Sequence, residues 1–113
     1  MGPITDAERL GWQRRAVAVL TELLARAQRD GLPLMRWTVQ PRAGLIASPD
    51  STDPAQRRAD WDVWCRVLGA RPWPEHTSSG RTHLHAVAER VDGLVTVAVL
   101  ADLLHDEPEE VGR

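Results

Sequence analysis

Two histidines separated by one residue are the most prominent chemistry-bearing feature of this sequence. His83 and His85 flank Leu84, and residues two apart on a β-strand point to the same side, about 6.5–7 Å from each other. Two imidazoles at this spacing can bind one metal ion. Glu75 or His76 in the preceding segment could supply a third ligand. Because no further ligand pair completes the set, we interpret these histidines as solvent-exposed and expect no metal or other cofactor.

A single cysteine, Cys65, offers little chemistry. It has no partner for an internal disulfide. Its neighbours at helical spacing, Trp61, Trp64 and Leu68, predict a buried and unreactive thiol. The sequence also has no glycine-rich phosphate loop, nucleophile elbow or His-Glu-x-x-His motif. No convergent catalytic set can be assembled, so we expect that the protein is not an enzyme.

The choice of basic residue in this chain is explained by its overall composition rather than by a function. All 14 are arginine, in a chain without Lys, Asn, Phe or Tyr, which indicates a GC-rich genome rather than selection for nucleic-acid binding. The formal net charge of −2 attracts neither DNA nor RNA. Two arginine pairs, Arg14 with Arg15 and Arg57 with Arg58, are the candidates for anion or nucleic-acid binding. Because the second pair opposes the dipole of the helix predicted there, we expect compensating contacts.

The first predicted helix must position one of these pairs. It follows Thr5, which has capping-box spacing to Glu8, and it ends at a glycine and a proline, Gly31 and Pro33. Its apolar residues form two stripes. One comprises Leu10, Val17, Leu20, Leu24 and Ala27, and the other comprises Trp12, Ala16, Val19 and Leu23. Together they cover about half of the circumference, more than the stripe of roughly 100° that a surface helix needs.

What covers the stripe that begins at Trp12 is open at this level. We predict that the stripe beginning at Leu10 faces the core. The Trp12 side then either makes a deeper core contact, is covered by the long loop that contains Trp73, or forms a homodimer interface through Trp12, Val19 and Leu23. Trp73 lies between two prolines and is either held against the domain or presented to a partner.

The remaining elements repeat a helix followed by two strands. A second helix follows Asp53 and Pro54 and ends at Gly69. Alternating or apolar stretches predict strands at residues 34–40, 45–48, 82–89 and 94–101, with residues 70–80 as a loop and a hairpin turn at Asp92-Gly93. Gln13-Arg14-Arg15-Ala16 recurs as Gln56-Arg57-Arg58-Ala59.

The predicted fold is therefore a two-layer α+β domain. It consists of an αββαββ pseudo-repeat with a four-stranded antiparallel sheet and both helices on one face. The run at residues 94–101 predicts a central strand, or one that is buried on both faces. We place the domain at residues 1–104 and an acidic, disordered tail at residues 105–113.

One stretch of the chain resembles a group of bacterial proteins. It comprises Trp73-Pro74-Glu75-His76-Thr77 and Thr82-His83-Leu84-His85-Ala86, downstream of an arginine-rich helix ending in Leu-Gly. The pattern resembles small proteins of streptomycetes and their phages or mobile elements, over about residues 34–101. That group has no assigned activity, so the resemblance implies only a bacterial or phage origin.

These observations favour a non-enzymatic protein-interaction module, an accessory or regulatory protein that acts as a homodimer. Two alternatives remain open. One is a nucleic-acid-associated regulator that uses the two arginine pairs, and the other is a metal-dependent enzyme at His83 and His85. The expected partners are a second copy and another protein. With one cysteine, no secretory signal and no membrane-length apolar run, the expected location is the cytoplasm.

Overall fold

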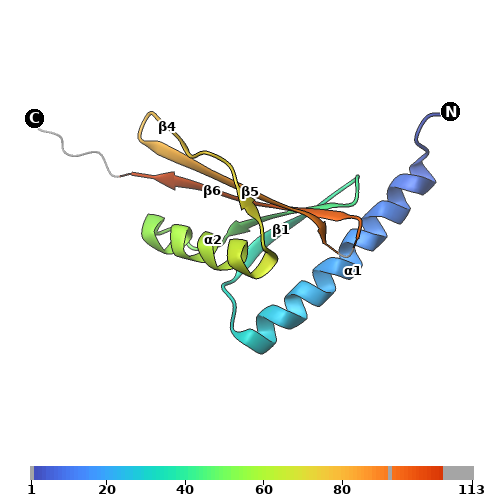
Figure 1. Ribbon diagram of the computed structural model, residues 1–113, viewed down its shortest axis with the longest axis horizontal. Coiled ribbons are helices and arrows are strands. Elements are labelled where there is room, and N and C mark those ends of the chain that lie inside the picture. Colours follow the sequence, from blue (N-terminus) through green and yellow to red (C-terminus); the bar gives the residue numbers. More distant parts are fainter. Residues whose placement is uncertain (1, 92, 106–113) are drawn as a thin grey trace, which may run out of the picture.

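Two helices lie against one side of a mixed β-sheet (Figure 1). The computed structural model describes residues 2–91 and 93–105, without the side chain of Arg90. The elements are α1 (Asp6–Asp30), β1 (Met35–Gln40), β2 (Gly44–Pro49), α2 (Pro54–Leu68), β3 (Arg71–Pro72), β4 (His76–Ser78), β5 (Arg81–Val91) and β6 (Val95–Leu104). The α+β class and the two helices agree with the prediction.

The sheet differs from the predicted one in strand number and in direction. Its order is β1-β2-β6-β5-β3, with β4 also paired to β5, which makes six strands rather than four. The two hairpins, β1–β2 and β5–β6, are antiparallel, but β2 and β6 pair in parallel. The prediction of a four-stranded antiparallel sheet was wrong. A tight turn dictates antiparallel pairing within a hairpin, whereas the long crossover through α2 permits parallel pairing between hairpins.

The two additional strands come from the segment that was expected to be a loop. Pro72 lies on the short edge strand β3, where a residue without an N–H group is tolerated. Strand β4 turns into β5 through Ser79 and Gly80, whose φ angles of 52° and 72° match the positive values of a type I′ turn. The two helix–hairpin units are therefore unequal, because only the second contains this extra hairpin.

Both helices begin and end as their sequences predict. In α1 the Thr5 hydroxyl accepts a hydrogen bond from the Glu8 N–H, and the Glu8 carboxylate accepts one from the Thr5 N–H, at 3.1 and 3.0 Å. In α2 the Asp53 carboxylate accepts from the N–H of Gln56. Left-handed glycines, Gly31 and Gly69, end the two helices. Local sequence thus decides where the helices stop.

The core lies between the helices and the inner side of the sheet. Strand β6 is central, as predicted, but only its alternate residues are buried: Val95, Val97, Val99, Ala101 and Leu103. Helix α2 adds two buried tryptophans whose indole N–H groups donate to backbone carbonyls, Trp61 to Val99 and Trp64 to Pro33, both at 2.9 Å. Burial raises the pKa of the Cys65 thiol to about 11, so it stays protonated at neutral pH. These contacts anchor α2 to the sheet.

Helix α1 reverses the roles that its two apolar stripes were expected to play. Val19 and Leu23 pack into the core beside Ala16, which is fully buried. The other stripe leaves three large side chains substantially exposed: Leu10, Val17 and Leu24. Val19 and Leu23, which were expected to contact a second copy, are instead buried within the single chain, and Trp12 beside them is half-buried. The small side chain of Ala16 lets this side of the helix approach the sheet closely, which a helical wheel cannot show.

The end of the predicted domain is only partly described. His105 belongs to the described fold, because its N–H donates to the Gly80 carbonyl and its ring shares a hydrogen bond of 2.7 Å with the Thr82 hydroxyl. The rest of the predicted tail, residues 106–113, and Asp92 of the predicted turn lie outside the described residues. Neither described helix combines the length and the apolarity needed to cross a membrane.

Candidate functional site

The side of the sheet that the helices leave uncovered carries His83, His85 and Trp73 from among the residues singled out from the sequence. Residues directly opposite each other on paired strands share a face. The register thus places Asp102, His83 and His76 in one row across β6, β5 and β4. In the next row His85 lies beside Leu100 of β6, and its carbonyl accepts a 2.8 Å hydrogen bond from the Trp73 N–H. We call this surface the open face.

His83 forms the shortest polar contact of the open face. Its Nδ1 lies 2.6 Å from Oδ1 of Asp102, and both side chains are about half exposed. A carboxylate at Nδ1 fixes the orientation of an imidazole and leaves Nε2 as its second hydrogen-bonding atom. At this exposure the pair contributes less than about 1 kcal/mol to stability. Its effect is to orient the ring rather than to hold the fold.

Trp73 is held against the open face, yet 53% of it remains exposed. Its ring stacks on His85, with centroids 3.9 Å apart and planes 20° apart. Burial lowers the pKa of His85, and nearby His83 lowers it further. Trp73 is therefore held against the domain by its backbone and its ring, while about half of its apolar surface remains exposed.

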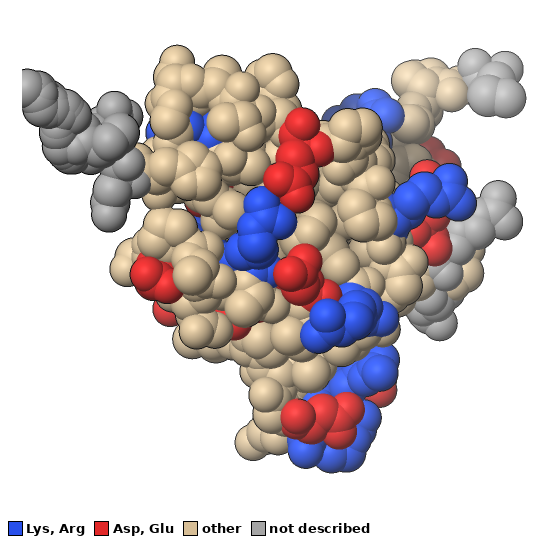
Figure 2. All heavy atoms as spheres, turned by 60° about the vertical axis from the view of Figure 1, so that its left-hand side comes forward, with Lys and Arg blue, Asp and Glu red and all other residues tan. Residues whose placement is uncertain are grey.

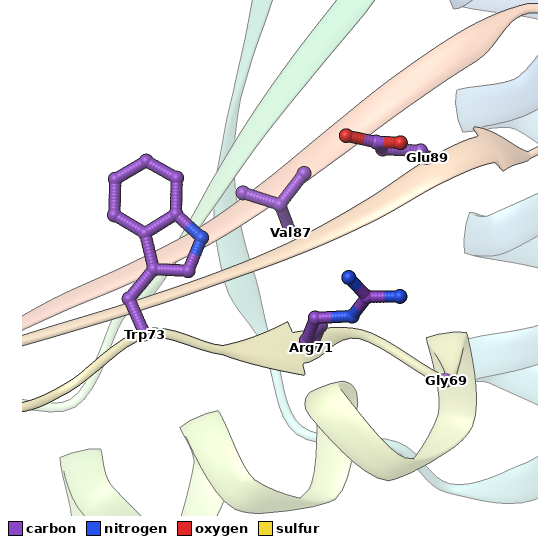
Figure 3. A pocket seen from close by; sticks show the side chains of 5 residues that line it. All are labelled: Gly69, Arg71, Trp73, Val87 and Glu89. Carbon is purple, nitrogen blue, oxygen red and sulfur yellow. The ribbon is translucent and has the colours of Figure 1, made fainter.

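Next to Trp73 the open face has a hollow of about 260 Å³, shown in Figure 3. Arg71 and Trp73 come from β3 and the residue after it, while Val87 and Glu89 come from β5, and Gly69 closes the hollow at the end of α2. One side chain is cationic, one anionic, one aromatic and one aliphatic. Among the described side chains no ion pair links Arg71 to Glu89 within 4.0 Å, so both charges face the hollow without neutralising each other.

The predicted metal residues come together only in part. His83 and His85 lie on the same side of β5, with ring centroids 6.1 Å apart. Glu75, considered as a third ligand, instead accepts two hydrogen bonds of 3.0 Å from Arg58. Within residues 2–91 and 93–105, no group of three or more His, Cys, Asp or Glu side chains is arranged to hold a metal. Among these described residues the pair is joined by no third protein ligand of the kind that zinc sites use.

The second arginine pair is engaged inside the chain. Arg57 donates to three backbone carbonyls, those of Pro49, Ser51 and Asp102, at 2.8–3.0 Å. The bidentate contact between Arg58 and Glu75 raises the pKa of Arg58 and lowers that of Glu75. These are the compensating contacts expected in the first turn of α2.

The first arginine pair is not engaged in this way. Arg14 and Arg15 lie exposed on α1, on a different helix from the engaged pair. Figure 2 shows basic and acidic side chains side by side on the face it presents, without a broad patch of one sign. Binding to a phosphate backbone requires clustered positive charge. The arrangement on this face does not supply such a cluster.

Part of the helix surface that the sequence assigned to the core is exposed in the structure. Leu10, Val17 and Leu24 of α1 are 60%, 47% and 47% exposed and follow one another at intervals of seven residues. Seven residues make almost two helical turns, so the three side chains form one line, which we call the outer stripe. At Leu24 the stripe reaches a hollow of about 250 Å³ that is lined also by Ala27, Leu32, Pro33, Leu34, Met35, Trp37 and Trp64. The seven-residue spacing was visible in the sequence and could have marked this surface.

Comparison with known proteins gives no information about the family or the function of this chain. No protein-family model matches the chain, and no curated protein or solved structure matches it.

Proposed function

We propose that this protein is a non-enzymatic interaction module that acts as a homodimer, with the outer stripe of α1 as its main contact surface. The observation that carries this proposal is the line of half-exposed large apolar residues Leu10, Val17 and Leu24. Soluble proteins rarely leave several large apolar side chains aligned in water unless a partner covers them.

The form of the stripe supports a helix as the contacting element. Paired helices pack along a seam of apolar residues at two positions of each seven-residue repeat, and the outer stripe supplies one of these two positions. Leu10 and Leu24 lie at equal distances on either side of Val17. A two-fold axis beside Val17 would therefore bring apolar side chains of one copy against apolar side chains of the other, because a two-fold interface must be complementary to itself.

The adjoining hollow extends the same surface. It contains Leu34, which is 72% exposed, and it reaches Trp37 on the edge strand β1. A specific interface usually buries more than about 1,000 Å² in total, which a single row of three side chains does not provide. The stripe together with this hollow gives the second copy a wider contact.

Sedimentation velocity at micromolar concentrations tests the proposal. We expect the wild-type chain to sediment as a dimer and Val17→Glu to sediment as a folded monomer, because two carboxylates would meet beside the two-fold axis. Ala25→Glu is the matched control, since Ala25 is also exposed on α1 but lies off the stripe. Circular dichroism of each variant reports whether α1 and the sheet remain folded.

Two results would contradict the proposal. One is a wild-type protein that stays monomeric throughout the micromolar range. The other is an Ala25→Glu variant that dissociates as readily as Val17→Glu, because the effect would then come from added negative charge and not from the stripe.

A further inference from the structure

We propose that the hollow beside Trp73 is a binding site for a small zwitterion of the α-amino acid class. In this site Arg71 takes the ligand carboxylate and Glu89 takes its ammonium group. The inference is independent of the homodimer, because it concerns the open face and not α1.

The first support is the separation of two opposite charges. Arg71 and Glu89 line the same hollow but form no ion pair with each other within 4.0 Å among the described side chains. A ligand whose ammonium and carboxylate groups are attached to the same carbon atom can contact both side chains at once. A simple anion or a simple cation would meet one favourable charge and one unfavourable charge, so the pair selects for a zwitterion.

The second support is the rest of the lining. Val87 lies between Trp73 and the two charged side chains, and the indole nitrogen of Trp73 is turned toward Val87 (Figure 3). The indole N–H can therefore donate a second hydrogen bond to a carboxylate held by Arg71. Val87 and the Trp73 ring offer an apolar surface to the ligand side chain. Small-molecule sites combine in this way a few placed polar groups with apolar walls.

The third support is the backbone that carries Glu89. The pairing of β5 with β6 is regular up to Ala88 and shifts register before Val91. Such an irregularity redirects side chains, and bulges occur frequently next to functional sites. Here it falls at the residue that supplies the negative charge of the hollow.

The size of the hollow limits the ligand. About 260 Å³ lies just below the usual range of ligand pockets, roughly 300–1,000 Å³. A single amino acid fits this volume, whereas a nucleotide or a folded peptide exceeds it. Since Arg71, Trp73 and Glu89 are all exposed, solvent screens the charges and the affinity is modest.

The test uses L-leucine and two derivatives that each lack one charge. In NMR titrations of the full chain, L-leucine should shift the Trp73 indole N–H resonance, assigned with Trp73→Leu, to a saturating value. N-acetyl-leucine has no ammonium group and leucinamide has no carboxylate. Each should bind about tenfold more weakly, the factor that one charge-assisted hydrogen bond provides.

Variants test whether Arg71 and Glu89 bind the ligand directly or act only through the net charge of the protein. Arg71→Gln and Glu89→Gln should each weaken L-leucine binding by a similar factor. The double variant Arg71→Glu/Glu89→Arg should retain binding, because a zwitterion can turn around in the hollow. Arg81→Gln is the control, since Arg81 lies on β5 outside the hollow.

The proposal is overturned if L-leucine leaves the Trp73 resonance unshifted at millimolar concentrations. Equal binding of leucine, N-acetyl-leucine and leucinamide would also overturn it, because the contact would then be an unspecific one on the indole. A loss in Arg81→Gln as large as that in Arg71→Gln would show a response to net charge alone.

Discussion

The two helices start from similar sequences and meet the sheet in different ways. Each has a side-chain cap at its start and a left-handed glycine at its end, and both pack on the same side of the sheet. Helix α2 buries Trp61 and Trp64 and leaves none of its large apolar side chains exposed. Helix α1 is ten residues longer, 25 against 15, and exposes Leu10, Val17 and Leu24.

This difference shows that the same amphipathic pattern can serve two purposes. The tryptophans of α2 have both apolar packing and hydrogen-bond partners within the chain. Helix α2 therefore needs no second copy to cover its apolar side chains. Helix α1 packs Ala16, Val19 and Leu23 into the core, whereas the outer stripe, Leu10, Val17 and Leu24, remains about half exposed. Substitutions in α2 should therefore change folding, whereas substitutions on the outer stripe should change association.

The largest expected effect is in α2. Trp64 is 1% exposed, packs edge-on against Trp37 at a centroid distance of 5.3 Å, and donates to the Pro33 carbonyl. Trp64→Ala should lower the free energy of unfolding by about 3–5 kcal/mol, the usual cost of truncating a buried tryptophan. Denaturant titration followed by circular dichroism measures this change, and a loss below about 1 kcal/mol would contradict the packing described.

A smaller effect is expected at the first turn of α2. Arg57→Ala leaves the carbonyls of Pro49, Ser51 and Asp102 without their guanidinium partner, which should cost roughly 1–3 kcal/mol of unfolding free energy. Arg66→Ala, at an exposed position in the last turn, is the control. If both variants lose the same stability in denaturant titrations, the contacts of Arg57 do not connect α2 to the sheet.

On the outer stripe we expect almost no change in the stability of a single copy. Leu10 is 60% exposed, so Leu10→Ser should alter the free energy of unfolding by less than about 0.5 kcal/mol at concentrations where the protein is monomeric. The same variant should weaken the dimer in sedimentation experiments. A marked loss of monomer stability would mean that α1 needs this stripe for folding, as α2 needs its tryptophans.

The smallest effect concerns pH and lies on the open face, which neither helix covers. Burial and His83 lower the pKa of His85 below its ordinary value of 6.5. Because the unfolded chain then binds a proton more readily, the stability contributed by neutral His85 is complete above about pH 6.5 and is lost as the pH falls toward the folded pKa. NMR titration of the His85 ring should give a midpoint below 6.5, and Trp73→Ala should raise that midpoint by exposing the ring. A midpoint at or above the ordinary value would contradict this.

The sequence by itself determined the local structure of this protein. Capping residues such as Thr5 and Asp53 and the glycines after each helix define its ends through backbone hydrogen bonds that form within a few residues. Alternation placed Leu84, Ala86 and Ala88 inward and His83 and His85 outward, because side chains alternate along any strand. The Ser79-Gly80 turn also had a local signal that could have revealed β4.

Only the tertiary structure decided how these pieces combine. The parallel pairing of β2 with β6 depends on a crossover path and not on any turn. The choice between the two stripes of α1 depends on how closely Ala16 approaches the sheet. The hollow beside Trp73 joins Arg71 to Glu89, 18 positions away, through strand pairing. Such contacts join residues distant in sequence, so no periodicity or spacing along the chain encodes them, and they form only when the layers pack together.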